Sequence, residues 1–477
     1  MDKNINSFGK NIRLTTEGGS HDEFITAKIS GFPAGVRIDR EKLLKFMARR
    51  APGNSAFATA RKESDEPIFL SGVDGNFVTN GDEMTIRIYS KNAKSSAYKD
   101  VHDIPRPSHA DYPAIVKYGR DVDLRGGGHF SGRLTALLCA FGGVCMQYLE
   151  EKGISVFSHI YSVYDINDKE FSLTEVGENE KNMLSSSLFP VLDNEAGKRM
   201  QEKIAEAKSR GDSVGGVIEC AVTGLPVGLG EHMFASVEAR ITEMLFSVPA
   251  LKGVEFGRGF DSCKLYGSEN NDPYVTDGKR VWTRTNNCGG ILGGMTNGMP
   301  IVFRVAMKPT PSIASERDSI SLSKMENTKL SIVGRHDPCI VPRAAAAVEA
   351  ASAIAVLDLM LDSRNENSAP ANENKQGGDR VESSRLSELR GVIDRCDRTI
   401  VATLAERMAA ASGVAEYKIQ NNLPVLDASR EAQLLEKIRM LAGEEYAEYF
   451  AEIYAAVLKT SKEYQQKMID NSRSEEK

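Results

Sequence analysis

Hydrophobic residues recur at steps of three and four along the carboxyl-terminal part of the chain, which places them on one face of an α-helix. They are Leu386, Leu389, Val392, Ile393, Cys396, Ile400, Leu404 and Met408. The helix can run to about residue 419, because the run NNLP at 421–424 contains a proline that ends it. Asp427 stands at the N-cap of a second helix that extends through Met440, and a third helix is predicted from about Glu444 onward.

A different pattern fills residues 1–363, where glycine is frequent and the apolar runs are short. The runs VIECAV (217–222) and IVFRV (301–305) predict strands, whereas 135–151 and 344–361 predict helices. Residues 364–384 are polar, lack aromatic side chains and contain Pro370 and a Gly-Gly pair, which is typical of a flexible linker. We therefore predict a mixed α/β or α+β domain at 1–363, a linker at 364–384 and an all-helical domain at 385–477.

The composition narrows the classes of function. A chain of 477 residues is longer than a domain with a single hydrophobic core, so two or more domains are expected. A net charge of −6 disfavours nucleic acid as a partner. The amino terminus has no apolar run, and no stretch approaches the ~20 apolar residues that cross a bilayer, so no membrane partner is expected. The seven cysteines have no C-x-x-C spacing, so we expect no disulfide framework, no metal and a cytoplasmic protein.

Four cations of the helical domain need explanation: Arg390, Arg407, Lys418 and Arg430. Any one of them can be a solvated charge on a helix face. At 1.5 Å per residue, Arg390 and Arg407 lie roughly 25 Å apart on one helix, and Arg390 and Lys418 roughly 42 Å apart. One straight helix cannot place them around one small ligand. Three helices, one of them very long, also make a poor monomeric core, so we predict a dimer whose second chain completes a shared site.

The helical domain resembles the all-helical chorismate mutases over residues 385–468, on LSELRGVIDRCDRTIVATLAERMAAASGVAEYK, PVLDASREAQLLEKI and SKEYQQ. The resemblance implies an intertwined dimer that rearranges chorismate to prephenate. It implies that Arg390 from the second chain and Arg407 grip the two carboxylates, while Lys418 and Gln465 bond the ether oxygen. It implies that four further residues hold the ring hydroxyl or line the site: Glu431, Asp427, Arg430 and Ser461.

The chemistry of that rearrangement suits these residue types. The reaction is a one-step pericyclic shift, so the protein must hold a flexible dianion in its reactive conformation. It must also stabilise the negative charge that develops on the ether oxygen, and fixed donors such as Lys418 and Gln465 do this best.

Four segments of the first domain place a histidine beside glycines or arginines: TTEGGSHD, RPSHADY, GGGHFSGR and GRHDPC. A lone histidine in a loop is usually a structural side chain. Here the glycines permit close approach of a ligand, and nearby arginines suit a phosphate or carboxylate group. Those arginines are at 49, 50, 61, 106, 125, 133 and 335. The domain has no Walker loop and no G-x-G-x-x-G, so a P-loop or Rossmann fold has little support.

These segments resemble chorismate synthase in order over residues 5–362, together with ARRAPGNS, ARKESDEPIFLSGV, GLPVGLGE, ALKGVEFGRGF and GGILGGMTNGMPIVFRVAMKPTPSI. The resemblance implies a β-α-β sandwich assembled as a homotetramer, whose mutase domains would pair as dimers. It implies that phosphate is eliminated from 5-enolpyruvylshikimate 3-phosphate to give chorismate. Reduced FMN (FMNH2) is the implied cofactor, with NADPH as a candidate reductant.

The resemblance also implies roles for single residues. His21 would protonate the departing phosphate, His109 would protonate near the reduced flavin, and Asp337 would assist hydrogen abstraction. The substrate would be held by Arg49, Arg50, Arg133 and Arg335. The flavin would contact His129, Ser131, Ala250, Gly293, Lys308, Thr310, Ser312 and Arg335.

The chain departs from the family pattern in a few clustered positions. GGSHD stands for the usual GESHG, so Gly19 replaces a carboxylate and Asp22 adds one. GGGHFSGRLT stands for GGGRSSARET, which places His129 and Phe130 at flavin-contact positions. Pro249 replaces an asparagine, and Ala56 replaces an arginine associated with nicotinamide binding.

Three hypotheses follow. The leading one is a bifunctional enzyme whose second domain consumes the product of the first. The clustered departures motivate an alternative in which an active mutase is carried on a degenerate synthase-like scaffold. A third makes the carboxyl-terminal domain a ligand-sensing regulatory module, which the intact set of Lys418 and Gln465 disfavours.

Overall fold

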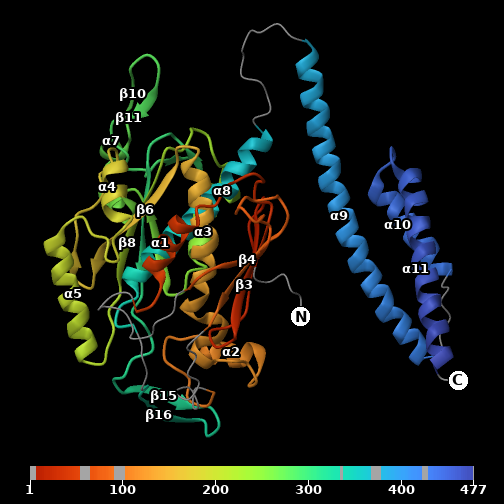
Figure 1. The fold of residues 1–477 in the computed structure, drawn as a ribbon, viewed down its shortest axis with the longest axis horizontal. Helices are drawn as coiled ribbons and strands as arrows, with labels where there is room; N and C mark the ends of the chain where they lie inside the picture. Colours follow the sequence, from red (N-terminus) through yellow and green to blue (C-terminus); the bar gives the residue numbers. More distant parts are fainter. Residues whose placement is uncertain are drawn as a thin grey trace. The chain divides into compact units, whose positions relative to one another are not determined.

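The structure is a computed structural model that describes residues 7–53, 65–90, 102–332, 337–366, 378–421 and 428–475. The chain divides into two units, Met1–Ala369 and Pro370–Lys477 (Figure 1). We call them the first unit and the helical unit. The division falls inside the linker that the sequence predicted.

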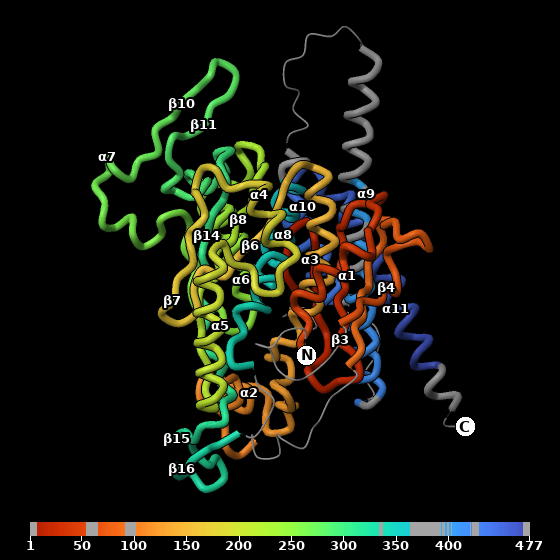
Figure 2. The backbone as a smooth tube through the Cα atoms, turned by 60° about the vertical axis from the view of Figure 1, so that its left-hand side comes forward, coloured from red at the N-terminus to blue at the C-terminus, as the bar shows by residue number. Residues whose placement is uncertain are grey.

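Two antiparallel five-stranded sheets form the first unit (Figure 2). The first sheet has the order β1-β2-β3-β5-β4, with bounds Ser7–Phe8, Arg13–Glu17, Phe24–Ser30, Met84–Tyr89 and Ile68–Ser71. The second has the order β7-β6-β8-β14-β9, with bounds Ile166–Asn167, Ser155–Val163, Gly216–Thr223, Ile301–Met307 and Leu251–Phe256. Three two-stranded ribbons are β10 and β11 (Tyr274–Thr276, Val281–Thr283), β12 and β13 (Ile291–Leu292, Met295–Thr296), and β15 and β16 (Arg317–Ser321, Glu326–Leu330).

Helices α1 (Arg40–Arg50), α3 (Thr135–Glu150) and α8 (Val341–Glu366) lie between the two sheets (Figure 1). Helix α3 contacts β3 and β5 of one sheet, α8 contacts β6 and β8 of the other, and the helices pack on each other. Close approach requires small residues, because a Cβ on Gly142 of α3 would lie 2.5 Å from Ala350 Cα of α8. The predicted β-α-β sandwich is therefore confirmed, and the predicted strands and helices at 135–151, 217–222, 301–305 and 344–361 all form.

The remaining helices and short 3₁₀ turns lie around this sandwich. They are α2 (Asp111–Tyr118), α4 (Glu178–Leu184), α5 (Asn194–Ser209), α6 (Val237–Leu245), α7 (Gly267–Asn270), η2 (Arg125–Phe130), η3 (Gly132–Leu134), η4 (Met233–Ala235) and η5 (Gly259–Lys264). The expectation that no stretch is apolar enough to cross a bilayer is wrong for α8, which is long and apolar enough by length and composition, although 89% of its apolar window is buried inside the structure. It is the core helix of the sandwich.

Charged groups in the core of the first unit form direct pairs. His159 on β6 is fully buried, with Nδ1 3.0 Å from Asp168 Oδ2 and Nε2 2.9 Å from Glu219 Oε2. Arg304 Nε also donates to Glu219 at 2.8 Å. Burial alone would lower the pKa of His159, but the two carboxylates outweigh it and raise that pKa. The imidazole is thus held as a cation between two acids inside the protein.

The helical unit consists of α9 (Gly378–Gln420), α10 (Ala428–Ala442) and α11 (Ala447–Glu475), with α11 packed on both others. The three predicted helices are confirmed. The linker predicted over 364–384 is wrong at both ends, because α8 continues to Glu366 and α9 begins at Gly378. Polar residues without a proline do not stop a helix, so polarity alone overestimated the length of the linker.

Candidate active site

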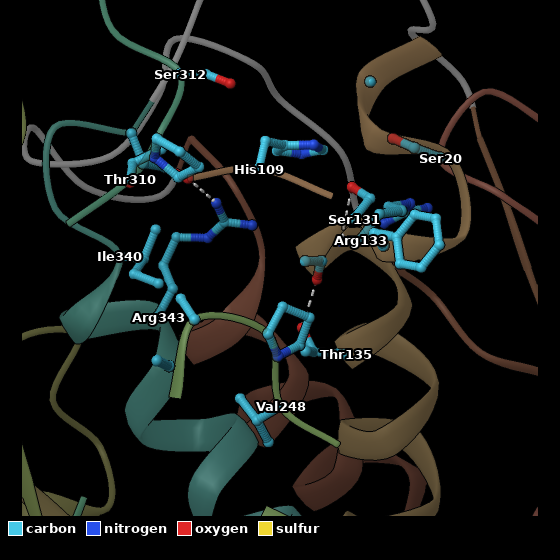
Figure 3. A pocket seen from close by; sticks show the side chains of 18 of the residues that line it. Ser20, His109, Ser131, Arg133, Thr135, Val248, Thr310, Ser312, Ile340 and Arg343 are labelled. Atoms are coloured by element: carbon cyan, nitrogen blue, oxygen red, sulfur yellow. Dashed lines mark hydrogen bonds and ion pairs between the residues drawn. The ribbon is translucent and has the colours of Figure 1, made fainter. Parts of the chain in front are cut away.

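A cavity of about 400 Å³ opens in the first unit where α1, α3 and α8 reach the loops at one end of the sandwich. Small-molecule sites range from about 300 to 1,000 Å³. Figure 3 shows Thr310, Ile340 and Arg343 on one side of it, Ser20, Ser131 and Arg133 on the other, and His109 between them. Its walls combine charged groups with apolar side chains; the apolar ones include Phe130, Val248, Pro249, Ala250, Ile340, Ala344 and Ala347.

Two lining arginines share one buried acid. Asp65 Oδ2 pairs with Arg50 Nη1, and Asp65 Oδ1 pairs with Arg133 Nη1. Arg50 ends helix α1, whose start is fixed to α3 because Gln147 bonds both backbone groups of the N-cap Asp39, at 2.7 and 3.0 Å. Burial by itself would raise the pKa of Asp65, but the two guanidiniums lower it below its ordinary value. The cavity thus has a fixed cationic wall.

A second buried acid orients His109. Asp111 Oδ1 is 2.7 Å from His109 Nδ1, and the same carboxylate accepts two bonds of 2.7 Å from Arg106. Arg106 and His109 outweigh burial and hold the pKa of Asp111 well below its usual range. An ionised Asp111 accepts a hydrogen bond from the N–H at Nδ1, so Nε2 is the nitrogen that can exchange a proton with a ligand.

The opposite wall comes from the end of β14 and the start of α8. Lys308 Nζ donates to Ser108 O, and burial lowers the pKa of this ammonium. Thr310 Oγ1 is buried and has no hydrogen-bond partner among the described residues. Asp337 pairs with Arg343 Nη1, and Arg343 Nε donates to Arg50 O at 2.9 Å. This wall therefore offers a cation, an acid and an unsatisfied hydroxyl.

The glycine-rich turn η2 lets the backbone approach His21 and His109. Gly126, Gly127 and Gly128 have φ values of 58°, 96° and 53°. A Cβ on Gly126 would lie 2.6 Å from His21 Nε2, and one on Gly127 would lie 3.4 Å from His109 Nε2. A side chain at Gly126 would displace the His21 imidazole, and the positive φ of Gly127 also favours glycine.

Most of the residues predicted for this site meet in the cavity, and three do not. The lining contains Arg50, His109, Ser131, Arg133, Ala250, Lys308, Thr310, Ser312 and Asp337. His21 lies against Gly126 at its edge. Arg335 lies outside the described residues.

The three exceptions are Arg49, His129 and Gly293. Arg49 is buried and forms a double ion pair with Glu349 at 2.6 and 2.7 Å, because successive residues of a helix point about 100° apart. His129 is exposed, with its Nδ1 2.9 Å from Gly18 O. Gly293 is exposed in the β12–β13 turn. None of the three lines the cavity.

The departure GGSHD has a local structural basis. The Asp22 carboxylate accepts the backbone N–H of Gly19 at 2.6 Å, and Asp22 N donates to Gly19 O at 3.2 Å. Asp22 therefore closes the turn that carries Ser20 and His21. The added acid supports the loop instead of facing the cavity.

In the helical unit, several predicted residues carry buried polar atoms. Arg407 Nη1 and Gln465 Oε1 are buried and have no hydrogen-bond partner among the described residues, and Ser461 is buried on α11. Glu431 on α10 pairs with Lys462 Nζ at 3.0 Å. Lys418 is half-buried and Arg430 is exposed. Asp427 and the side chain of Arg390 lie outside what the structure describes.

Sequence reasoning missed three residues that organise the cavity: Asp65, Asp111 and Arg343. Asp65 and Arg343 lie inside the matched stretches ARKESDEP and GRHDPCIVPRA, and Asp111 lies two residues after His109 in RPSHADY. An acid beside a candidate histidine is a signal for an orienting partner. The pairs of Asp65 with Arg50 and Arg133 and the bond from Arg343 to Arg50 O join distant parts of the chain, so no local signal reveals them.

Comparison with known proteins places both units. Residues 12–361 match the chorismate synthase family, and residues 389–466 match chorismate mutase type II. Chorismate synthase of Dehalococcoides mccartyi is 41% identical, over 75% of this chain and 96% of the relative. Chorismate synthase of Pyrococcus abyssi is also 41% identical, over 74% of this chain and 97% of the relative.

A solved structure agrees with these relatives. A crystal structure of chorismate synthase matches with a TM-score of 0.59 and 29% identity, over 75% of this chain and 93% of that one. The first unit thus shares both sequence and fold with these proteins along nearly their full length.

Proposed function

The chain belongs to the chorismate synthase family and carries a chorismate mutase domain, so it is a bifunctional synthase and mutase, and we propose how its residues perform the two reactions. The proposed sequence takes 5-enolpyruvylshikimate 3-phosphate to chorismate with loss of phosphate, and chorismate to prephenate. The observation that carries the first step is the cavity in which Arg50, Arg133, His109 and Asp337 converge.

The cavity fits reduced FMN as the proposed cofactor. An isoalloxazine ring needs apolar walls, which Val248, Ala250 and Ile340 supply, and polar edges, which Ser131 and Thr310 supply. The unsatisfied Thr310 Oγ1 is a buried group that awaits a hydrogen-bond partner. Ser131, Lys308, Thr310 and Ser312 would hold the flavin, which when bound supplies electron density for phosphate departure.

The protein's own groups would bind the substrate and move its protons. Arg50 and Arg133 present guanidiniums suited to phosphate or carboxylate oxygens. His21, at the edge beside Ser20 and Gly126, would give its proton to the departing phosphate. His109 would exchange a proton at Nε2 while Asp111 fixes Nδ1, and Asp337 would assist removal of the ring hydrogen.

In the helical unit, the polar groups would hold a dianion in place while its bonds rearrange. Arg407 would bind a carboxylate, and Lys418 and Gln465 would contact the ether oxygen. Gln465 would do so through its amide N–H, since its buried Oε1 is an acceptor. Glu431 would accept the ring hydroxyl, and Arg390 would come from a second chain.

A homotetramer with paired mutase domains accounts for the exposed apolar side chains of the helical unit. These include Ile393, Ile400, Val401, Tyr449, Phe450 and Ile453, each at least 45% exposed. Pairing two copies would cover them and bring in Arg390. Mutase activity is then expected to fall on dilution as pairs dissociate, whereas a concentration-independent mutase would exclude the shared site.

Four buried thiols, Cys139, Cys145, Cys220 and Cys339, support a cytoplasmic location in the same proposal. Burial raises the pKa of Cys139 and of Cys339 to about 12, so these thiols are poor nucleophiles. All seven cysteines are free thiols, which suits a reducing compartment. Fractionation of cells that express the chain tests this: we expect both activities in the soluble cytoplasmic fraction, and activity in a secreted fraction would contradict it.

Anaerobic titration with reduced FMN tests the assigned site. Thr310→Val removes the unsatisfied hydroxyl and is expected to weaken FMN binding about tenfold. Thr283→Val is the matched control, because Thr283 Oγ1 on β11 is also buried without a partner among the described residues but lies outside the cavity. Equal affinity of both variants for FMN would place the flavin elsewhere.

A further inference from the structure

Asp65 is a buried carboxylate that pairs with two arginines lining a cavity that must attract anions. It is 2% exposed, and each of its oxygens pairs with one guanidinium, Arg50 from α1 and Arg133 from η3. Its backbone has a φ of 49°, in the left-handed region that a non-glycine residue rarely adopts. A buried, strained acid at this position reduces the attraction for substrate, so a compensating role is expected.

Other contacts of the two arginines show what Asp65 adds. Arg50 Nε donates to Thr135 Oγ1 at 3.1 Å and Arg50 Nη2 to Gly132 O at 2.8 Å, while Arg133 Nη2 donates to Tyr89 O at 3.2 Å. Arg50 Nη2 also donates to Arg133 O at 3.4 Å, so these contacts tie the Arg50 guanidinium to the backbone that carries Arg133, and the Arg133 guanidinium to the end of β5. Asp65 bonds the charged ends of both side chains, so it sets the position of one guanidinium relative to the other.

We propose that Asp65 is a positioning residue that fixes Arg50 and Arg133 against each other and, by its charge, weakens the hold of the cavity on the phosphate product. The proposal rests on the proposed function, in which these arginines bind the anionic groups of the substrate. Two guanidiniums with one carboxylate carry a net charge of +1, whereas without the carboxylate they carry +2. The pair of arginines lowers the pKa of Asp65, which keeps this carboxylate ionised at neutral pH.

The Asp65→Asn variant separates the two effects. It keeps the shape of the side chain but removes the charge and one acceptor. Inorganic phosphate should bind about tenfold more tightly, because an extra positive charge then lies within a few ångströms of the anion in a partly buried site. Turnover should fall by about ten- to a hundredfold, because small misplacements of binding groups are costly to the chemical step.

Two further variants keep the test decisive. Glu349→Gln removes the buried carboxylate from Arg49, the neighbour of Arg50 on α1, and Arg49 does not line the cavity. It should lower thermal stability without tightening phosphate binding. Thr135→Val removes the acceptor of Arg50 Nε without changing any charge, and should lower turnover several-fold with phosphate affinity unchanged. If Asp65→Asn does not fold, Thr135→Val still tests whether the position of Arg50 affects turnover.

The experiment measures calorimetric binding of inorganic phosphate and steady-state phosphate release by the full-length chain and the three variants, after circular dichroism confirms folding. Tighter phosphate binding with lower turnover in Asp65→Asn supports the proposal, as does lower turnover of Thr135→Val at unchanged phosphate affinity. Unchanged turnover, or weaker phosphate binding, in a folded Asp65→Asn protein overturns it. Absence of phosphate release by the unsubstituted chain would instead overturn the proposed function.

Discussion

The two units prepare their sites in opposite ways. In the first unit the charged groups of the cavity are paired in advance: Arg50 and Arg133 with Asp65, His109 with Asp111, and Arg343 with Asp337. In the helical unit, Arg407 Nη1 and Gln465 Oε1 are buried and have no hydrogen-bond partner among the described residues. One site is organised by ion pairs within a single chain, whereas the other contains buried polar atoms that have no such partners among the described residues.

The difference follows from how each unit buries its residues. A sandwich with helices between two sheets has a large interior, and charges buried there must be neutralised by partners in the same chain. Three helices have a small interior and leave large apolar side chains such as Val401 (66% exposed) and Tyr449 (69%) uncovered. We propose that another copy of the chain completes the second site.

The largest effect is expected when a buried ion pair in the core of the first unit loses one partner. His159→Leu leaves Asp168 and Glu219 facing each other without the cation, and is expected to reduce the free energy of unfolding by about 3–5 kcal/mol. Urea denaturation measures it. His232→Leu is the matched control, because His232 pairs with Glu231 at 2.7 Å on the surface, and no measurable change is expected. Equal stability of both variants would show that the buried pairs are not needed.

The next largest effect tests the unsatisfied site. Lys418→Ala removes the proposed donor to the ether oxygen, so the activation barrier of the mutase reaction should rise by about 2.7–4 kcal/mol, while phosphate release by the first unit is unchanged. Conversion of added chorismate, followed by absorbance, measures it. If the domain only senses ligands, the unsubstituted chain has no mutase activity. Lys418→Ala would then change only the regulation of phosphate release.

The pH dependence of stability sharpens the account of paired charges. The folded-state pKa of His159 is raised above its ordinary 6.5, so its stabilising contribution is complete below pH 6.5 and is lost as pH rises through the folded-state value. The free energy of unfolding should decline there by up to about 1.4 kcal/mol per pH unit. His159→Gln should remove this decline; a decline that persists in the variant would assign it to another group.

The smallest effect is expected at His129. This residue departs from the family pattern, but its side chain is exposed and its Nδ1 bonds Gly18 O outside the cavity. His129→Ala should change kcat/KM for phosphate release by no more than about twofold, since exposed substitutions usually alter free energies by less than 0.5 kcal/mol. A tenfold loss would show that His129 reaches the ligand and would restore its predicted contact with flavin.

Local sequence patterns predicted the helices and strands well, but they could not predict contacts between distant parts of the chain. The helices at α9, α10 and α11 follow from apolar spacing, and the linker was overestimated because polar residues also form helices. Arg49 and Arg50 are neighbours of the same residue type. Arg49 points into the core and pairs with Glu349, whereas Arg50 lines the cavity. That choice depends on how α1 docks on α3 and α8, which one helix does not reveal. Asp65 could not be predicted for the same reason.

Anaerobic incubation of the whole chain with 5-enolpyruvylshikimate 3-phosphate and chemically reduced FMN tests the central claim most directly. Phosphate release and the identity of the organic product are followed together. We predict that phosphate appears and that prephenate accumulates, because the cavity of the first unit makes chorismate and the helical unit consumes it. Protein that releases no phosphate but still converts added chorismate to prephenate would contradict the account and leave a mutase on an inactive scaffold.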